Sequence, residues 1–316
     1  MSPDRGRPRH DVALTRDWLA EGTRRLLEAV EALPDDAFGG ASRLPGWSRA
    51  HVVAHVARNA EALGRLAAWA RTGVETPMYA DAATRDADIE RSAGRPAAEL
   101  RHDLAATAAE LDLALDALDD GAWQATVRAR AGREVRASVL PWLRVREVWL
   151  HRADLAEPEP EPGPGRGPGP GPGPGPGRGT DATGGLVDLP EGLLAELLTD
   201  VAGTLSADPS CPRLRLRATE SDLVVPLGGD AAAAGAPAEQ VGWGGAIEVA
   251  GPGAALLLWL AGRSSGAGLS VEGVAVQPLP AERAATDEGA ATDEGAAADE
   301  GAADDGAGLP LLPRWL

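Results

Sequence analysis

The sequence predicts an α+β protein in which a four-helix bundle precedes a smaller domain of mixed helices and strands. Two observations support this fold class. In the first half of the chain, apolar side chains recur at helical spacings over four long stretches, whereas the second half has short apolar or alternating segments of strand length. A run of Pro and Gly separates the halves and lacks the apolar residues that a core needs.

The helices of the predicted bundle have recognisable start and stop signals. The first ends before Pro34, the second begins after the N-cap residue Ser48, and Gly73 ends the second. A short hairpin is expected at 127–135, between the third and fourth helices. The four helices are predicted over residues 11–33, 49–72, 96–118 and 140–155.

The smaller domain has weaker signals. We expect helices over 193–205 and 254–260, and strands over 214–218, 223–225 and 247–249. The whole chain is expected to comprise the bundle at 11–156, a disordered Pro/Gly linker at 157–183, the α+β domain at 184–280, a disordered acidic low-complexity insert at 281–308 and an apolar docking segment at 309–316.

The composition excludes several classes of function. The formal net charge of −18 argues against nucleic-acid binding, which needs clustered Lys and Arg. The single cysteine, Cys211, excludes an internal disulfide and any Cys-x-x-Cys metal site. The sequence shows neither a signal peptide nor a stretch long enough to cross a membrane. We therefore expect a cytoplasmic monomer that acts on small molecules and binds neither nucleic acid nor membrane.

The fourth predicted helix places ionisable side chains on an apolar face. At about 100° per residue, Glu147 and His151 share an arc of roughly 100° with Leu140, Val148 and Leu155. Burying both ionisable groups without partners costs on the order of several kcal/mol. Pairing or metal coordination removes that cost.

The second predicted helix supplies a further candidate ligand. His55 lies roughly 60° from the centre of the apolar stripe, whereas His51 lies roughly 100° away. His55, Glu147 and His151 offer the three N/O ligands that a catalytic zinc takes from a protein while a fourth position stays open. Two other interpretations remain: His51 and His55 as ordinary surface histidines, and Glu147 in a plain ion pair with Arg144 or His151.

Four motifs are recognisable in order along the chain, and a fifth short motif closes it. They are Leu44-Pro45-Gly46-Trp47-Ser48-Arg49-Ala50-His51 continued by His55-Val56-Ala57-Arg58-Asn59-Ala60, then Glu75-Thr76-Pro77-Met78-Tyr79, Arg146-Glu147-Val148-Trp149-Leu150-His151, Ala261-Gly262-Arg263, and the ending Leu312-Pro313-Arg314-Trp315-Leu316. With these motifs, the chain resembles the mycothiol-dependent maleylpyruvate isomerases. The resemblance covers both predicted domains and misses only the two low-complexity inserts.

The resemblance implies a DinB-like metal-binding four-helix bundle followed by a smaller α+β domain. It implies that His55, Glu147 and His151 hold zinc and that mycothiol is the thiol cofactor. It also carries a catalytic role onto Arg263. Arg144 and Arg85 are further candidates for binding the substrate, because a guanidinium clamps a carboxylate through two hydrogen bonds.

The implied reaction is the cis to trans isomerisation of 3-maleylpyruvate to 3-fumarylpyruvate, a step of gentisate breakdown. A mycothiol sulfur on zinc would lose its proton, and the thiolate would add to the double bond, allow rotation and leave. Arg263 would hold a carboxylate or the developing enolate charge. Two alternatives are a mycothiol S-transferase that conjugates another electrophile at the same zinc, and a non-catalytic metal-binding module.

Overall fold

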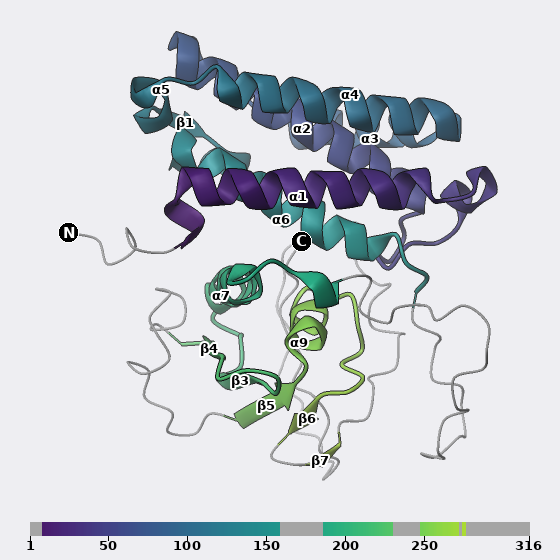
Figure 1. Cartoon of the computed structure of the whole chain (residues 1–316), viewed down its shortest axis with the longest axis vertical. Helices are drawn as coiled ribbons and strands as arrows, with labels where there is room; N and C mark the ends of the chain where they lie inside the picture. Colours follow the sequence, from purple (N-terminus) through teal and green to yellow (C-terminus); the bar gives the residue numbers. More distant parts are fainter. Residues whose placement is uncertain (1–7, 159–185, 230–246, 272–273, 276–316) are drawn as a thin grey trace, which may run out of the picture. The chain divides into compact units, whose positions relative to one another are not determined.

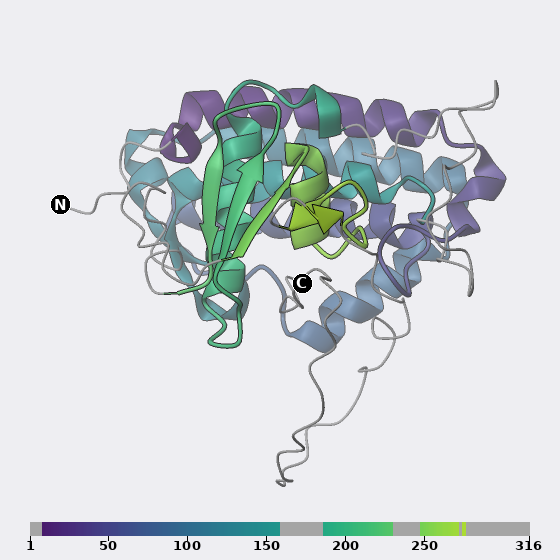
Figure 2. The ribbon, with the colours of Figure 1, turned by 90° about the horizontal axis from the view of Figure 1, so that it is seen from below.

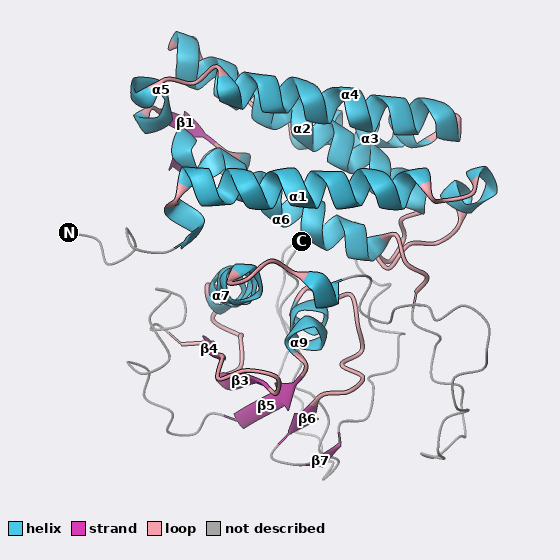
Figure 3. Cartoon of the chain, in the orientation of Figure 1, coloured by secondary structure: helices cyan, strands magenta, loops and turns pink. Residues whose placement is uncertain are grey.

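The computed structural model describes residues 8–158, 186–229, 247–271 and 274–275. These residues form two compact units, of which the first comprises 8–158 and 186–196. Helices dominate the first unit, and the larger sheet lies in the second (Figure 3), which confirms the predicted α+β class. The expected linker from residue 159 onward, the acidic insert and the docking segment lie outside the described residues, and the expected domain boundaries remain predictions.

Four long helices build the first unit and confirm the predicted bundle. They run alongside one another in Figure 1, where α2 packs against α4 and α6, and α1 packs against α6. Within the described part of the chain, no helix combines the length and apolar character needed to cross a bilayer. The four helices are α1 (Val12–Glu31), α2 (Arg49–Thr72), α4 (Ala97–Asp116) and α6 (Leu140–Asp154).

Local signals fix both ends of α2. The Ser48 hydroxyl accepts a hydrogen bond from the His51 amide, and the His51 ring accepts one from the Ser48 amide, so the two residues form a capping box. At the other end, Gly73 has a φ of 72°, a left-handed conformation that favours glycine. These signals set the register of α2 and hence the position of His55.

A close approach at Gly22 seats α6 against α1. A Cβ atom at Gly22 would lie 2.5 Å from Nε1 of Trp149, so the helices reach this separation only with glycine. The indole of Trp149 is fully buried and donates a hydrogen bond of 3.0 Å to the Trp18 carbonyl. This contact anchors the helix that carries Glu147 and His151.

Shorter elements complete the first unit. The predicted hairpin is confirmed, with Val127 opposite Val135. The sequence pattern did not predict α3, because Ile89 is its one large apolar side chain and a single such residue has no periodicity. The elements are α3 (Ala82–Ala93), α5 (Asp120–Gln124), β1 (Thr126–Arg128), β2 (Glu134–Arg136) and the 3-10 turns η1 (Pro8–His10), η2 (Asp35–Gly39), η3 (Arg130–Gly132), η4 (Ala137–Val139) and η5 (Leu186–Asp188).

The second unit contains a five-stranded sheet in the order β4-β3-β5-β6-β7. Strand β3 lies between β4 and β5 in the ribbon of Figure 2 and pairs antiparallel with β4 and parallel with β5. Leu216 therefore has Val225 on one side and Val249 on the other. Helix α9 packs against β3 and β5. The elements are α7 (Leu193–Ser206), which begins in the first unit, β3 (Leu214–Ala218), β4 (Val224–Leu227), β5 (Ile247–Gly251), α9 (Gly253–Leu260), β6 (Ser270–Val271) and β7 (Val274–Ala275).

The sequence predicted most of these second-unit elements. Helices α7 and α9 and strands β3, β4 and β5 correspond to predicted segments. Strands β6 and β7 were not predicted, because two residues each are too short to show an alternating pattern.

Candidate metal centre

Three side chains from two helices meet inside the first unit. His55 belongs to α2, and Glu147 and His151 belong to α6. The Nε2 atoms of His55 and His151 lie 3.0 Å and 3.2 Å from the same atom, Oε2 of Glu147. One candidate ligand atom from each residue lies within 4.8 Å of the others. The structure therefore brings together the three residues that the sequence singled out.

The cluster is closed on the imidazole side and open at the carboxylate. The side chains of His55 and His151 are 8% and 3% exposed, whereas that of Glu147 is 23% exposed. The two rings meet edge to face with their centroids 4.7 Å apart, and Trp47 covers His55 with a centroid separation of 5.4 Å. Glu147 is therefore the most exposed of the three side chains.

The second nitrogen of His151 has a partner that the sequence did not single out. Its Nδ1 lies 2.8 Å from Oδ2 of Asp154, whose side chain is fully buried. A carboxylate accepts, so Nδ1 carries the proton and donates it to Asp154. Histidine ligands of metals commonly donate their other N–H to a carboxylate in this way, which fixes the tautomer and the ring orientation. The sequence signal was a carboxylate three residues after His151, on the same helical face.

Burial and hydrogen bonds give the three groups different protonation tendencies. Burial lowers the pKa of His55 to about 4, so this imidazole is neutral at physiological pH. Burial alone would raise the pKa of Glu147, but hydrogen bonds from both histidines hold it well below its usual value. Burial alone would lower the pKa of His151, but its hydrogen bonds to Asp154 and Glu147 raise it.

The donor set fits a divalent cation. His151 donates from Nδ1 to Asp154, and its raised pKa favours a second proton on Nε2, which donates to Glu147. A divalent cation can take the place of this second proton, because Nε2 then presents its lone pair to the metal while Nδ1 stays bonded to Asp154. Two imidazole nitrogens and one carboxylate oxygen are the ligands that zinc accepts at open, catalytic sites.

Two buried arginines hold the ligand-bearing helices together. Arg144 on α6 is 1% exposed and donates from Nη1 to the Val56 carbonyl at 2.7 Å and to Oδ1 of Asn59 at 2.9 Å, both on α2. Arg49 at the start of α2 donates to the Leu155 carbonyl at the end of α6 at 2.7 Å. Burial lowers the pKa of Arg144 to about 10, so its charge persists at neutral pH. These contacts place Arg144 between the helices as a brace.

A nearby cavity is linked to the cluster through Arg85 of α3, although the three cluster residues themselves do not line it. It has a volume of about 510 Å³, in the range typical of small-molecule sites, and Tyr79 and Arg85 line it. Nη2 of Arg85 lies 3.4 Å from Nδ1 of His55. Burial raises the pKa of Tyr79, which also has Arg85 and Glu147 nearby, so its hydroxyl keeps its proton. The sequence signal for Tyr79 was its place in the segment Glu75-Thr76-Pro77-Met78-Tyr79.

Two other residues considered in the sequence analysis do not join the three ligands: His51 has other partners in the first unit, and Arg263 belongs to the second unit. His51 directs Nδ1 to the Ser48 hydroxyl at 2.6 Å and Nε2 to Glu90 at 3.2 Å. Arg263 follows α9 in the second unit, is 5% exposed, and donates to the Ala261 carbonyl. Its catalytic role remains a prediction.

The chain matches two family models and solved structures of one enzyme. Residues 5–156 match the mycothiol maleylpyruvate isomerase N-terminal domain, and residues 188–282 match the MDMPI C-terminal domain. Two crystal structures, of the mycothiol-dependent maleylpyruvate isomerase and of a histidine-to-alanine mutant, each match with a TM-score of 0.67 and 28% sequence identity, covering 85% of this chain and 96% of theirs. No curated protein matches the chain significantly. With a match in each of its two units and an aligned structure over most of its length, the chain belongs to the mycothiol-dependent maleylpyruvate isomerase family.

Proposed function

We propose that the chain is a zinc- and mycothiol-dependent cis–trans isomerase that converts 3-maleylpyruvate to 3-fumarylpyruvate by thiolate addition, bond rotation and elimination. One observation carries this proposal: two histidines and a glutamate converge within 4.8 Å, and Arg85, which lies 3.4 Å from His55, lines a nearby cavity. Family membership supports the choice of thiol and substrate, since the aligned solved structures are described as those of the mycothiol-dependent maleylpyruvate isomerase.

His55, Glu147 and His151 would hold the zinc ion. The low pKa of His55 keeps a lone pair available, and the low pKa of Glu147 keeps its carboxylate ionised. When bound, zinc supplies a Lewis acid that lowers the pKa of a coordinated thiol. Asp154 would keep the His151 ring in the tautomer that presents Nε2 to the metal.

Side chains of the cavity would bind and orient the substrate. Arg85 lies beside His55 and can pair with a substrate carboxylate, because its ion pair is with the exposed Asp86 and is weak. The Tyr79 hydroxyl keeps its proton and can donate a hydrogen bond to the enolate oxygen that develops during addition. From the sequence motif alone, Arg263 is proposed as a second stabiliser of this charge.

The remaining features of the proposal concern the setting of the enzyme. We place it in the cytoplasm as a monomer acting on small molecules, in gentisate catabolism, with no nucleic-acid or membrane partner. The acidic composition and the reducing conditions that a thiol cofactor needs support this setting.

The test combines turnover with metal analysis. Purified full-length protein loaded with zinc is mixed with mycothiol and 3-maleylpyruvate, and fumarylpyruvate formation is followed. We expect turnover that requires both thiol and zinc. Consumption of mycothiol without formation of fumarylpyruvate would support the S-transferase alternative. A zinc-loaded protein with no thiol-dependent activity would support the alternative of a non-catalytic metal-binding module.

A further inference from the structure

The hairpin formed by β1 and β2 is locally basic in an acidic protein. Residues 126–136 contain four arginines and one carboxylate, whereas the whole chain has a net charge of −18. Two of these arginines, Arg128 and Arg130, line the cavity that also contains Tyr79 and Arg85. An arginine of this wall that lacks a carboxylate partner can bind an anionic ligand.

The other charged groups of this cavity have partners. Arg128 pairs with Glu75 and lies over the Trp69 ring at 5.6 Å, and Arg85 pairs with Asp86 at 2.6 Å. The third carboxylate of the cavity wall, Asp81, accepts a hydrogen bond of 2.6 Å from the Thr84 amide and caps α3. The wall thus has three arginines and three carboxylates, and among the described residues Arg130 is the one arginine of the wall without a carboxylate partner.

Arg130 stands at the tip of the hairpin as an exposed cation. Its side chain has no hydrogen bond or ion pair to the described residues, and it belongs to the short turn η3 that joins the two strands. The Arg128 and Glu75 side chains are 50% and 55% exposed, so their pair is weak and exchanges readily for a ligand carboxylate. The cavity therefore has one free guanidinium, at Arg130, and a second, at Arg128, that can be released.

We propose that Arg130, assisted by Arg128, binds the carboxylate of a short aliphatic dicarboxylate substrate that lies away from the metal centre. This inference rests on the proposed function and assigns the residue that makes the site select a dicarboxylate over a monocarboxylate. Arg85, beside His55, would hold the carboxylate nearer the reacting bond. The two charged ends of the ligand then bind at two places in one cavity.

The hairpin offers a matched control for this proposal. Arg133 belongs to the same connection and is exposed, but it does not line the cavity. Arg130→Ala and Arg133→Ala therefore change the net charge equally and differ in which side chain faces the ligand. Arg130→Lys keeps the charge and loses the planar pair of donors.

The experiment measures equilibrium binding of maleate and of monomethyl maleate to the zinc-loaded protein by titration calorimetry. We expect wild type and Arg133→Ala to bind maleate at least about ten-fold more tightly than the monoester, whereas Arg130→Ala loses this preference and Arg130→Lys keeps part of it. In turnover assays, Arg130→Ala should raise KM for the dicarboxylate by about ten-fold, with kcat and KM for the thiol changed by less than about two-fold.

Two results would overturn the inference. One is an equal loss of the preference for maleate in Arg130→Ala and Arg133→Ala, which would mean that the overall positive charge of the hairpin, and not a contact with Arg130, causes the preference. The other is a wild-type protein that does not distinguish maleate from its monoester. Because binding is measured without turnover, neither result bears on whether the protein is an isomerase. If selective binding is intact but no turnover occurs, the proposed function is wrong and the inference about Arg130 stands.

Discussion

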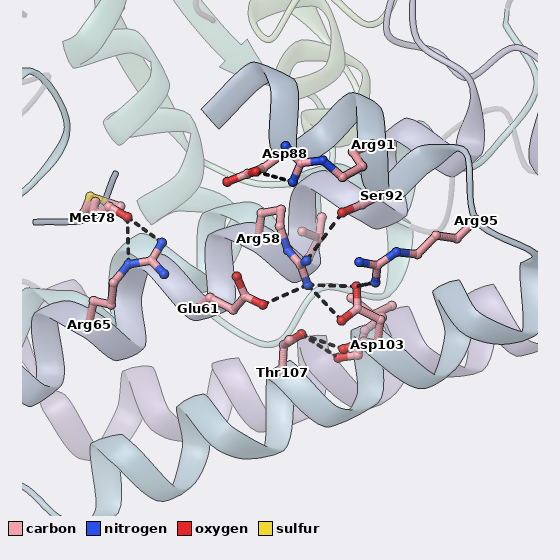
Figure 4. A network of polar contacts seen from close by, with 12 residues as sticks. Arg58, Glu61, Arg65, Met78, Asp88, Arg91, Ser92, Arg95, Asp103 and Thr107 are labelled. Carbon is pink, nitrogen blue, oxygen red and sulfur yellow. Dashed lines mark hydrogen bonds and ion pairs between the residues drawn. The ribbon is translucent and has the colours of Figure 1, made fainter. Parts of the chain in front are cut away.

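Helix α2 takes part in two polar clusters that differ in how their charges are compensated. In the ligand cluster, His55 meets Glu147 and His151 of α6. In the Arg58 network, shown in Figure 4, Arg58 donates to both carboxylate oxygens of Asp103 at 2.8 Å. The network also includes Glu61, Ser92 and Arg95.

The difference separates a structural cluster from a candidate functional one. The Arg58 network contains two guanidiniums and two carboxylates, so its formal charges cancel without any ligand. In the ligand cluster, two ring nitrogens converge on one carboxylate oxygen, and Asp154 orients His151 so that Nε2 is the nitrogen available to a metal. Charges that cancel among themselves indicate a role in stability, whereas two imidazoles and a carboxylate that converge on one point form a donor set for a metal ion.

Removing the shared carboxylate should have the largest effect. In Glu147→Gln the two imidazoles lose the anion between them, and a metal loses one of three protein ligands. We expect loss of stoichiometric zinc and a fall in activity of about a thousand-fold or more, because the thiol is then not activated. The zinc content after dialysis against a weak chelator measures the loss of metal, and initial rates measure the fall in activity.

Glu61→Gln is the matched control, because it makes the same substitution at a glutamate of the Arg58 network, outside the ligand cluster. It should keep full zinc. Retained stoichiometric zinc in Glu147→Gln would remove Glu147 from the ligand set and undo the contrast between the clusters.

Asp154 sharpens the comparison by acting through a ligand. Asp154→Asn keeps the size of the side chain and loses the carboxylate that orients His151. We expect zinc affinity to fall by about ten- to a hundred-fold, with a stoichiometric site at saturating zinc. Competition with a chromophoric chelator measures the Kd, and an unchanged Kd would mean that the ring is oriented by packing alone.

The comparison also shows where the sequence was informative. The helical positions of His55, Glu147 and His151 followed from spacing and apolar neighbours, because these patterns depend on local geometry. Asp154 and Tyr79 were not assigned roles. Asp154 lies three residues after His151 on the same helix, so this spacing could have indicated it. The position of Tyr79 depends on which segments meet in the fold, which local periodicity does not encode.

The missed helix α3 illustrates the same limit. Its residues are largely polar, and it is placed by tertiary contacts with α2 rather than by an apolar stripe of its own. Arg85 belongs to this helix, so the family resemblance could suggest it as a substrate-binding residue, but no sequence pattern predicted that it lies beside His55. The cavity beside the metal centre was likewise beyond the sequence, because its wall joins α3 to a hairpin about forty residues later.

Breaking the Arg58 network should cost stability and spare the metal. Asp103→Ala removes the carboxylate that receives both bonds from Arg58, leaving this 12% exposed guanidinium with Glu61 and Ser92. We expect a loss of about 2 kcal/mol in the free energy of unfolding, reduced from that of a fully buried pair because Asp103 is 18% exposed. Urea unfolding of the zinc-loaded protein measures it, and zinc loss alongside would mean that the two clusters are coupled.

The smallest effect is expected at His51, which lies one helical turn before His55 and belongs to neither cluster. His51→Ala removes the ring nitrogen that completes the capping box with Ser48, and it removes an exposed contact with Glu90. The Ser48 hydroxyl still accepts from the backbone amide of residue 51, so we expect a loss of about 0.5 kcal/mol and unchanged zinc affinity. Chelator competition and urea unfolding give both values. A large fall in zinc affinity would place His51 in the coordination sphere and would show that the ligand cluster extends beyond the three residues that converge on Glu147.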